Sequence, residues 1–225
     1  DGTGVEVLEP CDRLREPSKP ISSEITVLTG ITDAMVAGKS IDPSEVTMFA
    51  APAAVVIAHN AAFDRRFLER FSPVFSTKPW ACSMSEIDWA AEGFEGAKLS
   101  YLAMALGFFY DRHRAANDCL AAIELLAREL PRARAPALAK LLERARLPTW
   151  RIWAENSPFE FKDLLKARGY RWNGEENGKP RSWYVDVSDA EKEAEISYLA
   201  REIYQYEVDV RTVRVTAYDR FSNRV

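Results

Sequence analysis

The sequence predicts a mixed α/β domain followed by a small α+β module. A short apolar run at residues 53–58 is rich in β-branched residues, which is typical of a strand buried on both faces. The apolar spacing then changes to the period of an amphipathic helix. Beyond Leu147-Pro148, strand and helix patterns alternate in a segment of different character. We therefore expect one domain over residues 1–147 and a second over residues 148–225.

The composition is that of a soluble globular protein. Hydrophobic residues make up 47% of the 225-residue chain and charged residues 28%. No apolar run approaches the roughly 20 residues that span a bilayer, and the start at Asp1 has neither the basic nor the apolar region of a signal peptide. Three scattered cysteines are too few for a disulfide framework. These features predict a cytoplasmic protein without a membrane partner.

The formal net charge of −4 argues against a protein that coats DNA without specificity, because such proteins are usually basic. It does not argue against an enzyme that holds one strand end through local arginines and metal ions.

The first domain begins with short elements. Val5 to Leu8 has the pattern of a short strand. Asp42 can cap a helix that runs to about Ala50, because Pro43 suits the first helical position and Glu45 can reach back to the cap. The remaining expected elements are a strand at 53–58, a helix after Asn60, an edge strand at 80–83, and helices at 99–106, 117–130 and 136–146.

The helix after Asn60 has a clear apolar face. Asn60 is a plausible N-cap. The apolar residues fall at i, i+4, i+5 and i+8, and charged residues take the other side. The apolar set is Phe63, Phe67, Leu68 and Phe71, and the charged set is Arg65, Arg66, Glu69 and Arg70.

The second domain has the order strand, helix, strand, strand, helix, strand, which suggests a split βαβ module. Its basic and aromatic residues allow two interpretations. They form a surface for single-stranded nucleic acid, or the tryptophans are the core of a small sheet and the charges are solvated, which we favour because so small a domain needs its aromatics for burial. The residues concerned are Lys162, Lys166, Arg168, Arg171, Trp172 and Trp183.

Two acidic residues stand out for their positions. Asp64 follows the buried strand in the first turn of a helix, and Asp118 begins a later helix with His113 in the loop before it. Ligands collect at the carboxyl ends of such strands, and Mg²⁺ is bound by a few carboxylates with water and phosphate oxygens. An imidazole can accept a proton from water. Taken singly, each aspartate is more typical of an ordinary helix start, and His113 of a solvated loop.

Together, the two segments resemble a known family. Asn60-Ala-Ala-Phe-Asp64 and His113-Arg-Ala-Ala-Asn-Asp118 are similar to the second and third motifs of the DEDDh 3′–5′ exonucleases. This superfamily includes the proofreading ε subunit of bacterial DNA polymerase III, ribonuclease T and oligoribonuclease. Residues 28–36 resemble the segment that precedes the second motif, and the resemblance covers about residues 1–130. His113, rather than a tyrosine four residues before Asp118, indicates the histidine branch.

The resemblance implies a ribonuclease-H-like mixed sheet flanked by helices and two Mg²⁺ or Mn²⁺ ions that hydrolyse the phosphodiester. It makes Asp64 and Asp118 metal ligands and His113 the general base. Four residues are expected near the terminal nucleotide. These are Gly30, Ile31, Asn60 and Phe63. Phe63 is equally well explained as helix core, because its spacing with Phe67 is also a core pattern.

One motif of the family is absent. Its first motif, Asp-x-Glu on the first strand, supplies two further carboxylates, and Asp1, Glu9 and Asp12 do not stand in that context. Asp1-Gly-Thr-Gly resembles the turn after that strand. We therefore expect an N-terminal segment to be absent here, and this fragment to bind metal weakly and to have little activity.

The resulting function is a 3′–5′ exonuclease that releases nucleoside monophosphates from single-stranded DNA or RNA 3′ ends, in repair or proofreading. The hypothesis includes DNA polymerase III as a partner. The alternative is a non-catalytic nucleic-acid-binding relative that lacks the first metal motif. A nucleotide-binding Rossmann scaffold is disfavoured because the chain has no Gly-x-Gly-x-x-Gly fingerprint.

Overall fold

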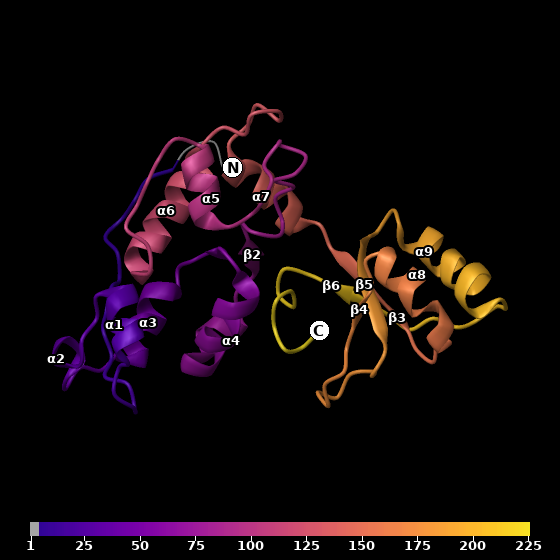
Figure 1. Cartoon of the computed structure of the whole chain (residues 1–225), viewed down its shortest axis with the longest axis horizontal. Helices are drawn as coiled ribbons and strands as arrows, with labels where there is room; N and C mark the ends of the chain where they lie inside the picture. Colours follow the sequence, from indigo (N-terminus) through magenta and orange to yellow (C-terminus); the bar gives the residue numbers. More distant parts are fainter. Residues whose placement is uncertain (1–4) are drawn as a thin grey trace. The chain divides into compact units, whose positions relative to one another are not determined.

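The computed structural model describes residues 5–225, and the chain divides into two compact units (Figure 1). Unit 1 comprises Asp1–Ala145 and Tyr218–Val225, and unit 2 comprises Arg146–Ala217. We expected the second module to begin at 148 and to run to the end of the chain. In the structure, residues 218–225 belong instead to unit 1, so the chain leaves unit 1 and returns to it.

Unit 1 is a mixed α/β unit with a small parallel sheet. Strand β1 (Val56–Ala58) pairs with β2 (Trp80–Cys82), and Val56 lies opposite Trp80. Helix α4 connects the two strands and contacts both, which makes a βαβ unit. The other elements are α1 (Ser23–Thr29), α2 (Asp33–Val36), α3 (Pro43–Ala50), α4 (Ala61–Phe71), η1 (Pro73–Ser76), α5 (Leu99–Ala105), α6 (Ala115–Ala127) and α7 (Ala137–Arg146).

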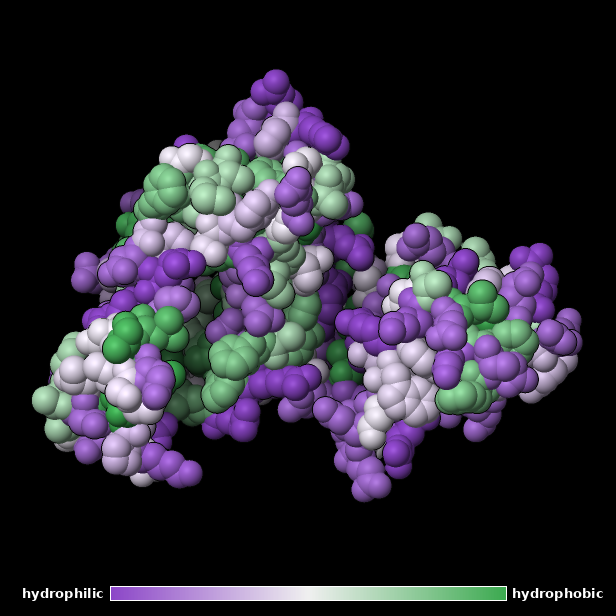
Figure 2. Space-filling view, in the orientation of Figure 1, coloured by the Kyte–Doolittle hydropathy of each residue, from purple (hydrophilic) through white to green (hydrophobic). Residues whose placement is uncertain are grey.

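Two apolar clusters stabilise unit 1. The larger one joins the helices α5, α6 and α7 to Trp89 in the loop after β2. The smaller one packs Ala61, at the start of α4, against Trp80 and Phe75. Apolar side chains also remain on the outside, where Figure 2 shows green surface over α3 and α4; Met48, Phe49, Phe63 and Phe67 are all more than half exposed.

Several local predictions are confirmed. The Asp42 carboxylate accepts a hydrogen bond from the Ser44 amide at 2.8 Å and caps α3, with Pro43 in its first turn. Glu45 does not reach back to the cap, because it forms an ion pair with Arg13. The buried strand is present but is shorter than expected and only half-buried, whereas β2 is fully buried.

The expected strand at Val5 to Leu8 is wrong. These residues are exposed and belong to no strand. A strand requires a neighbouring backbone to satisfy its ladder of hydrogen bonds, and residues 5–8 find none among the described residues. Farther on, residues 23–29 form a helix that the mixed pattern of apolar and hydroxyl side chains did not predict. Ser22 caps it by accepting a hydrogen bond from the Ile25 amide at 3.4 Å.

Unit 2 is a four-stranded antiparallel sheet with the order β4-β5-β3-β6. Strands β3 and β4, which α8 connects in sequence, are separated in the sheet by β5, which is the split βαβ arrangement. The elements are β3 (Thr149–Ala154), η2 (Phe159–Phe161), α8 (Lys162–Ala167), β4 (Arg171–Trp172), β5 (Trp183–Ser188), α9 (Lys192–Tyr198), η3 (Leu199–Tyr204) and β6 (Thr212–Val215).

The aromatic residues of unit 2 divide between core and surface. Trp183 packs against the cluster around Ile152 and Leu165. Trp172 is 55% exposed and makes an edge contact with Trp183, with 5.7 Å between the ring centroids. Arg168 is held by the buried Glu195. The six basic and aromatic residues named above therefore do not form one exposed surface.

No helix within residues 5–225 is long and apolar enough to cross a membrane.

Candidate nuclease site

The two aspartates predicted as metal ligands occupy equivalent places on two helices. Asp64 lies in the first turn of α4, and Asp118 lies in the first turn of α6. Among the described residues, neither helix start has a side-chain cap hydrogen bond. The amide groups at both starts favour negative charge, from a carboxylate or from a phosphate.

The charges of Asp64 and Asp118 both raise the pKa of the Cys119 thiol. Cys119 follows Asp118, and although the residue as a whole is exposed, burial is the first cause that raises the pKa of its thiol. The negative charges of Asp64 and Asp118 raise that pKa further, and Asp12 adds a smaller effect. Because such charge effects require proximity in a partly hydrated site, the structure brings Asp64 and Asp118 to the same region.

The half-buried carboxyl of Asp64 is held in an unfavourable environment for an anion. Burial raises its pKa above the ordinary value, and its own backbone amide opposes this by a hydrogen bond. A neighbouring cation would favour the charged form.

Tyr110 is a member of the site that the sequence reasoning missed. Burial, followed by the charge of the nearby Asp118 carboxylate, raises the pKa of its phenol. The phenol of Tyr110 therefore lies close to the carboxylate at the start of α6. The available signal was the position of Tyr110 in the loop that carries His113.

The loop before α6 is folded back on the helix start. The Asn117 side-chain amide donates a hydrogen bond to the Asp111 carbonyl at 3.0 Å. His113 is exposed and has a positive φ of 68°, which directs the chain into the helix. Within residues 5–225, no hydrogen bond joins His113 to either Asp64 or Asp118. The imidazole thus lies two residues before α6, at the exposed rim.

The segment around Gly30 is linked to the same helix start. Arg114, at the N-cap position of α6, donates a hydrogen bond to the Thr29 carbonyl at 3.4 Å. Gly30 ends α1 in the left-handed conformation with φ 69°, which glycine adopts without strain. The half-buried Ile31 donates its amide to the Thr29 hydroxyl at 3.1 Å. Arg114 therefore brings the segment with Gly30 and Ile31 beside α6.

Asn60 and Phe63 lie at the start of α4. Asn60 has φ 90° and makes no side-chain cap, so the expected N-cap hydrogen bond is absent from the described structure. The Ala61 amide instead donates to the Cys82 sulfur at 3.4 Å. Phe63 is 60% exposed and its ring centroid lies 4.9 Å from that of Phe67. The interpretation of Phe63 as helix core is wrong, because Phe63 and Phe67 form an exposed aromatic pair on the surface of α4.

His59 has a structural position. Its Nε2 donates to the Ala97 carbonyl at 2.7 Å, so Nδ1 is the acceptor for the Ser83 hydroxyl at 2.9 Å. Burial lowers the pKa of this imidazole. Both ring nitrogens are therefore occupied in the neutral form.

The donor set of the site fits a hard cation. Asp64 and Asp118 offer carboxylate oxygens, and Mg²⁺ binds through one or two carboxylates together with water and phosphate oxygens. Within residues 5–225, no group of three or more His, Cys, Asp or Glu side chains is placed to hold a metal ion. The two carboxylates supply the kind of oxygen ligand that Mg²⁺ and Mn²⁺ bind.

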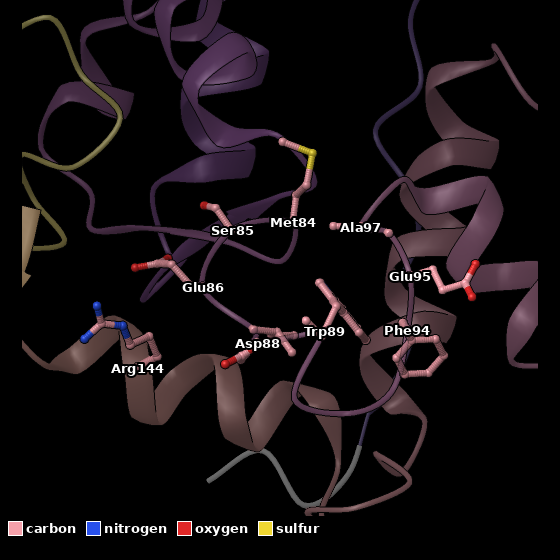
Figure 3. A pocket seen from close by; sticks show the side chains of 12 residues that line it. Met84, Ser85, Glu86, Asp88, Trp89, Phe94, Glu95, Ala97 and Arg144 are labelled. Atoms are coloured by element: carbon pink, nitrogen blue, oxygen red, sulfur yellow. The ribbon is translucent and has the colours of Figure 1, made fainter. Parts of the chain in front are cut away.

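A separate cavity of about 470 Å³ lies in the loop after β2 (Figure 3). Figure 3 shows Glu86 and Arg144 at one end of it and Phe94 and Glu95 at the other. None of Asp64, Asp118 or His113 lines this cavity, so it is distinct from the site at the helix starts.

Comparisons with known proteins agree with the motif pattern. The family model of the RNase T exonucleases matches residues 1–126. The chain is 34% identical, over 144 residues, to a DNA polymerase III subunit epsilon-like protein of Rhodobacter capsulatus, a match that covers 58% of this chain and 20% of the relative. It is 38% identical, over 65 residues, to a PolC-type DNA polymerase III of Halalkalibacterium halodurans, which covers 28% of this chain and 4% of the relative.

A solved structure, exonuclease X in complex with 5′-overhanging duplex DNA, is 27% identical with a TM-score of 0.41. It covers 55% of this chain and 72% of that chain. The chain spans only about a fifth of the Rhodobacter relative and a smaller share of the polymerase. The family model extends over more than half of the chain and includes both motifs, Asn60 to Asp64 and His113 to Asp118, and this protein therefore belongs to the exonuclease family that the model describes, within the DEDDh superfamily.

Proposed function

We propose that this protein is a 3′–5′ exonuclease that removes nucleotides from single-stranded nucleic-acid ends with the help of two divalent metal ions. The observation that carries the proposal is the convergence of Asp64 and Asp118, from the first turns of two helices, on the region of Cys119. The membership of the chain in an exonuclease family supports the reaction class. The ribonuclease-H-like fold is part of the same proposal.

Asp64 and Asp118 would hold Mg²⁺ or Mn²⁺ through their carboxylate oxygens, together with water and phosphate oxygens. The metal would supply charge for the scissile phosphate and a lower pKa for a bound water. Tyr110, whose phenol lies close to the Asp118 carboxylate, would orient that carboxylate. Outer contacts of this kind are important because they fix the direction of a ligand's lone pairs.

His113 would accept the proton of the attacking water. Its exposed position at the rim of α6 leaves the imidazole accessible to a bound strand, and catalytic hydrogen bonds often form only in the substrate complex.

The terminal nucleotide would contact the residues near the start of α4 and the end of α1. The exposed ring of Phe63 offers a face on which a base can stack, and Asn60 is the N-cap residue three positions before it. Gly30 and Ile31 would lie along the sugar and phosphate, because Arg114 holds their segment beside α6. The substrate is DNA or RNA, and a role in repair or proofreading beside DNA polymerase III is part of the proposal.

A non-catalytic nucleic-acid-binding protein is the second candidate. One observation favours it, namely that residues 5–225 contain no group of three or more metal-ligating side chains. The two candidates differ in whether nucleotides are released.

The test uses the full-length natural protein and a 3′-labelled single strand. We expect Mg²⁺-dependent release of labelled mononucleotides that is blocked by EDTA and by Asp118→Asn. The matched control is Asp163→Asn, an exposed aspartate of α8, which should leave the rate unchanged. Activity that survives Asp118→Ala would refute the site assignment. Strand binding without any release would favour the non-catalytic candidate.

A further inference from the structure

Residues 218–225, which we name the tail segment, are bound to the helix that carries Asp64. The tail segment follows unit 2 in the sequence but is part of unit 1. Its main contact is Arg65, the residue directly after Asp64 on α4.

Arg65 is fully buried and its guanidinium is shared between the tail segment and α4. Two of its nitrogens donate to tail carbonyls, to Tyr218 at 2.6 Å and to Arg220 at 2.7 Å. Its Nε donates to Glu69, one turn farther along α4, at 2.7 Å. The guanidinium carbon also lies 5.5 Å from the centroid of the Trp80 ring on β2. One side chain thus connects the helix, the sheet and the tail.

A second arginine repeats the connection from the tail side. Arg224 donates to Glu69 at 3.1 Å and to the Tyr218 carbonyl at 2.6 Å. Glu69 is therefore shared by Arg65 and Arg224. The tail holds a compact turn, because Ser222 donates its hydroxyl to the Asp219 carbonyl at 2.6 Å.

The tail is also anchored to the sheet and to the apolar cluster. Arg220 forms an ion pair with Glu86, and the other oxygen of Glu86 accepts the Cys82 amide at the end of β2 at 2.8 Å. Phe221 packs against the cluster that contains Ala61, the first residue of α4. Together these contacts hold α4 against the tail segment at Ala61, Arg65 and Glu69.

A buried arginine is a poor way to obtain stability alone. Removing a charge from water costs several kcal/mol, and a well-packed apolar residue of similar volume is often as stabilising. What the guanidinium adds is direction, because its donors form a rigid fork that accepts few orientations. Arg65 and Asp64 are neighbours on one helix turn, so a rotation of α4 that moves one moves the other.

We propose that the tail segment and Arg65 position Asp64 for metal binding, so that Arg65 is a positioning residue of the site. This inference rests on the proposed exonuclease function. The start of α4 lacks a side-chain cap within the described structure, and the fork of Arg65 on the tail carbonyls fixes the turn instead. The tail segment therefore belongs to the site although it lies more than 150 positions after Asp64 in the chain.

The test measures Mn²⁺ binding to the full-length protein by electron paramagnetic resonance, together with the Mn²⁺ dependence of nucleotide release. Arg65→Met removes the fork and keeps an apolar side chain of similar length, and Arg65→Lys keeps only the charge. We expect both to raise the Mn²⁺ dissociation constant about tenfold to a hundredfold, with release restored towards the natural rate at saturating Mn²⁺.

Two further variants complete the design. Arg224→Ala removes the ion pair between the tail segment and Glu69 at a partly exposed residue. This variant should fold and should raise the Mn²⁺ dissociation constant severalfold. Arg66→Lys, exposed on the same helix, is the matched control and should leave the constant unchanged.

A folded Arg65→Met or Arg224→Ala protein with the natural Mn²⁺ affinity would overturn the inference. If the natural protein itself bound no Mn²⁺ and released no nucleotide, the proposed function would fail first, and the inference with it. Weak binding in the variants, with strong binding in the natural protein and in Arg66→Lys, supports the positioning role.

Discussion

Tyr170 donates its hydroxyl to the carboxylate of Glu195 at 2.8 Å inside unit 2, where Glu195 is only 7% exposed. Arg168 binds the same carboxylate through its Nε and Nη2. Burial, followed by the charge of Glu195, raises the pKa of the Tyr170 phenol, so it remains a donor throughout the physiological range. One arginine and one phenol thus both bind this buried carboxylate.

Tyr170→Phe should destabilise the protein by about 1–3 kcal/mol, because a buried carboxylate loses one of its donors. Urea unfolding followed by tryptophan fluorescence would measure the loss. Tyr206→Phe is the control, since Tyr206 is 63% exposed, and it should change the free energy of unfolding by less than about 0.5 kcal/mol. Equal effects of the two substitutions would contradict the role of the buried pair.

The stability of the protein should fall in mild acid because of His59. Burial lowers the pKa of His59 below its ordinary value of 6.5, so the unfolded chain binds a proton at a higher pH than the folded chain. The stabilising contribution is complete above 6.5 and is lost as the pH falls through the lower folded pKa. Thermal unfolding between pH 8 and pH 5 would measure this decline.

The chain has only two histidines, which makes the control simple. His59→Gln should flatten the decline below pH 6.5, whereas His113→Gln, at an exposed position, should leave it in place. If the stability of His59→Gln still declined below pH 6.5, titratable groups other than His59 would cause the decline.

His113→Ala should slow nucleotide release by the full-length protein by about a hundredfold to ten-thousandfold, as expected for loss of a general base. The affinity for Mn²⁺ should not change, because His113 is not a proposed ligand. Single-turnover release and Mn²⁺ titration would separate these effects. A weakened Mn²⁺ affinity would indicate a ligand role for His113 instead.

Phe63→Ala should raise the KM for a single strand while leaving the melting temperature nearly unchanged, because the side chain is 60% exposed and packs mainly on Phe67. Phe75→Ala is the contrasting substitution. Phe75 is only 6% exposed, and its loss should cost about 3–5 kcal/mol of stability. A large fall in melting temperature for Phe63→Ala would favour a structural role.

Local signals in the sequence predicted the elements that carry the candidate site. The helix starts at Asp64 and Asp118 follow from short-range rules for first turns and apolar spacing, and both helices are present. The Asp42 cap of α3 is confirmed for the same reason. Such features depend on a few neighbouring residues, so a single sequence contains the necessary information.

Long-range contacts decided the features that the sequence did not predict. Arg65 falls on the charged side of its helix by spacing, yet it is fully buried because the tail segment covers it. The residues near Arg65 in the chain do not predict its burial, because its partners Tyr218 and Arg220 are far away in sequence. The same limit applies to residues 218–225, which we expected in the second domain because they follow it in sequence, although they pack in unit 1.

The return of the chain to unit 1 has a consequence for proteolysis. Because unit 2 is an insertion with both of its ends covalently continued in unit 1, a single cut in the segment around Arg146 does not release it. A protease must also cut near Ala217, and the tail segment then remains on α4 through Arg65 and Glu69. A gene fragment that ends at Ala145 would produce unit 1 without the tail segment. The structural domain is therefore discontinuous in sequence and cannot be expressed as one continuous stretch that leaves out unit 2.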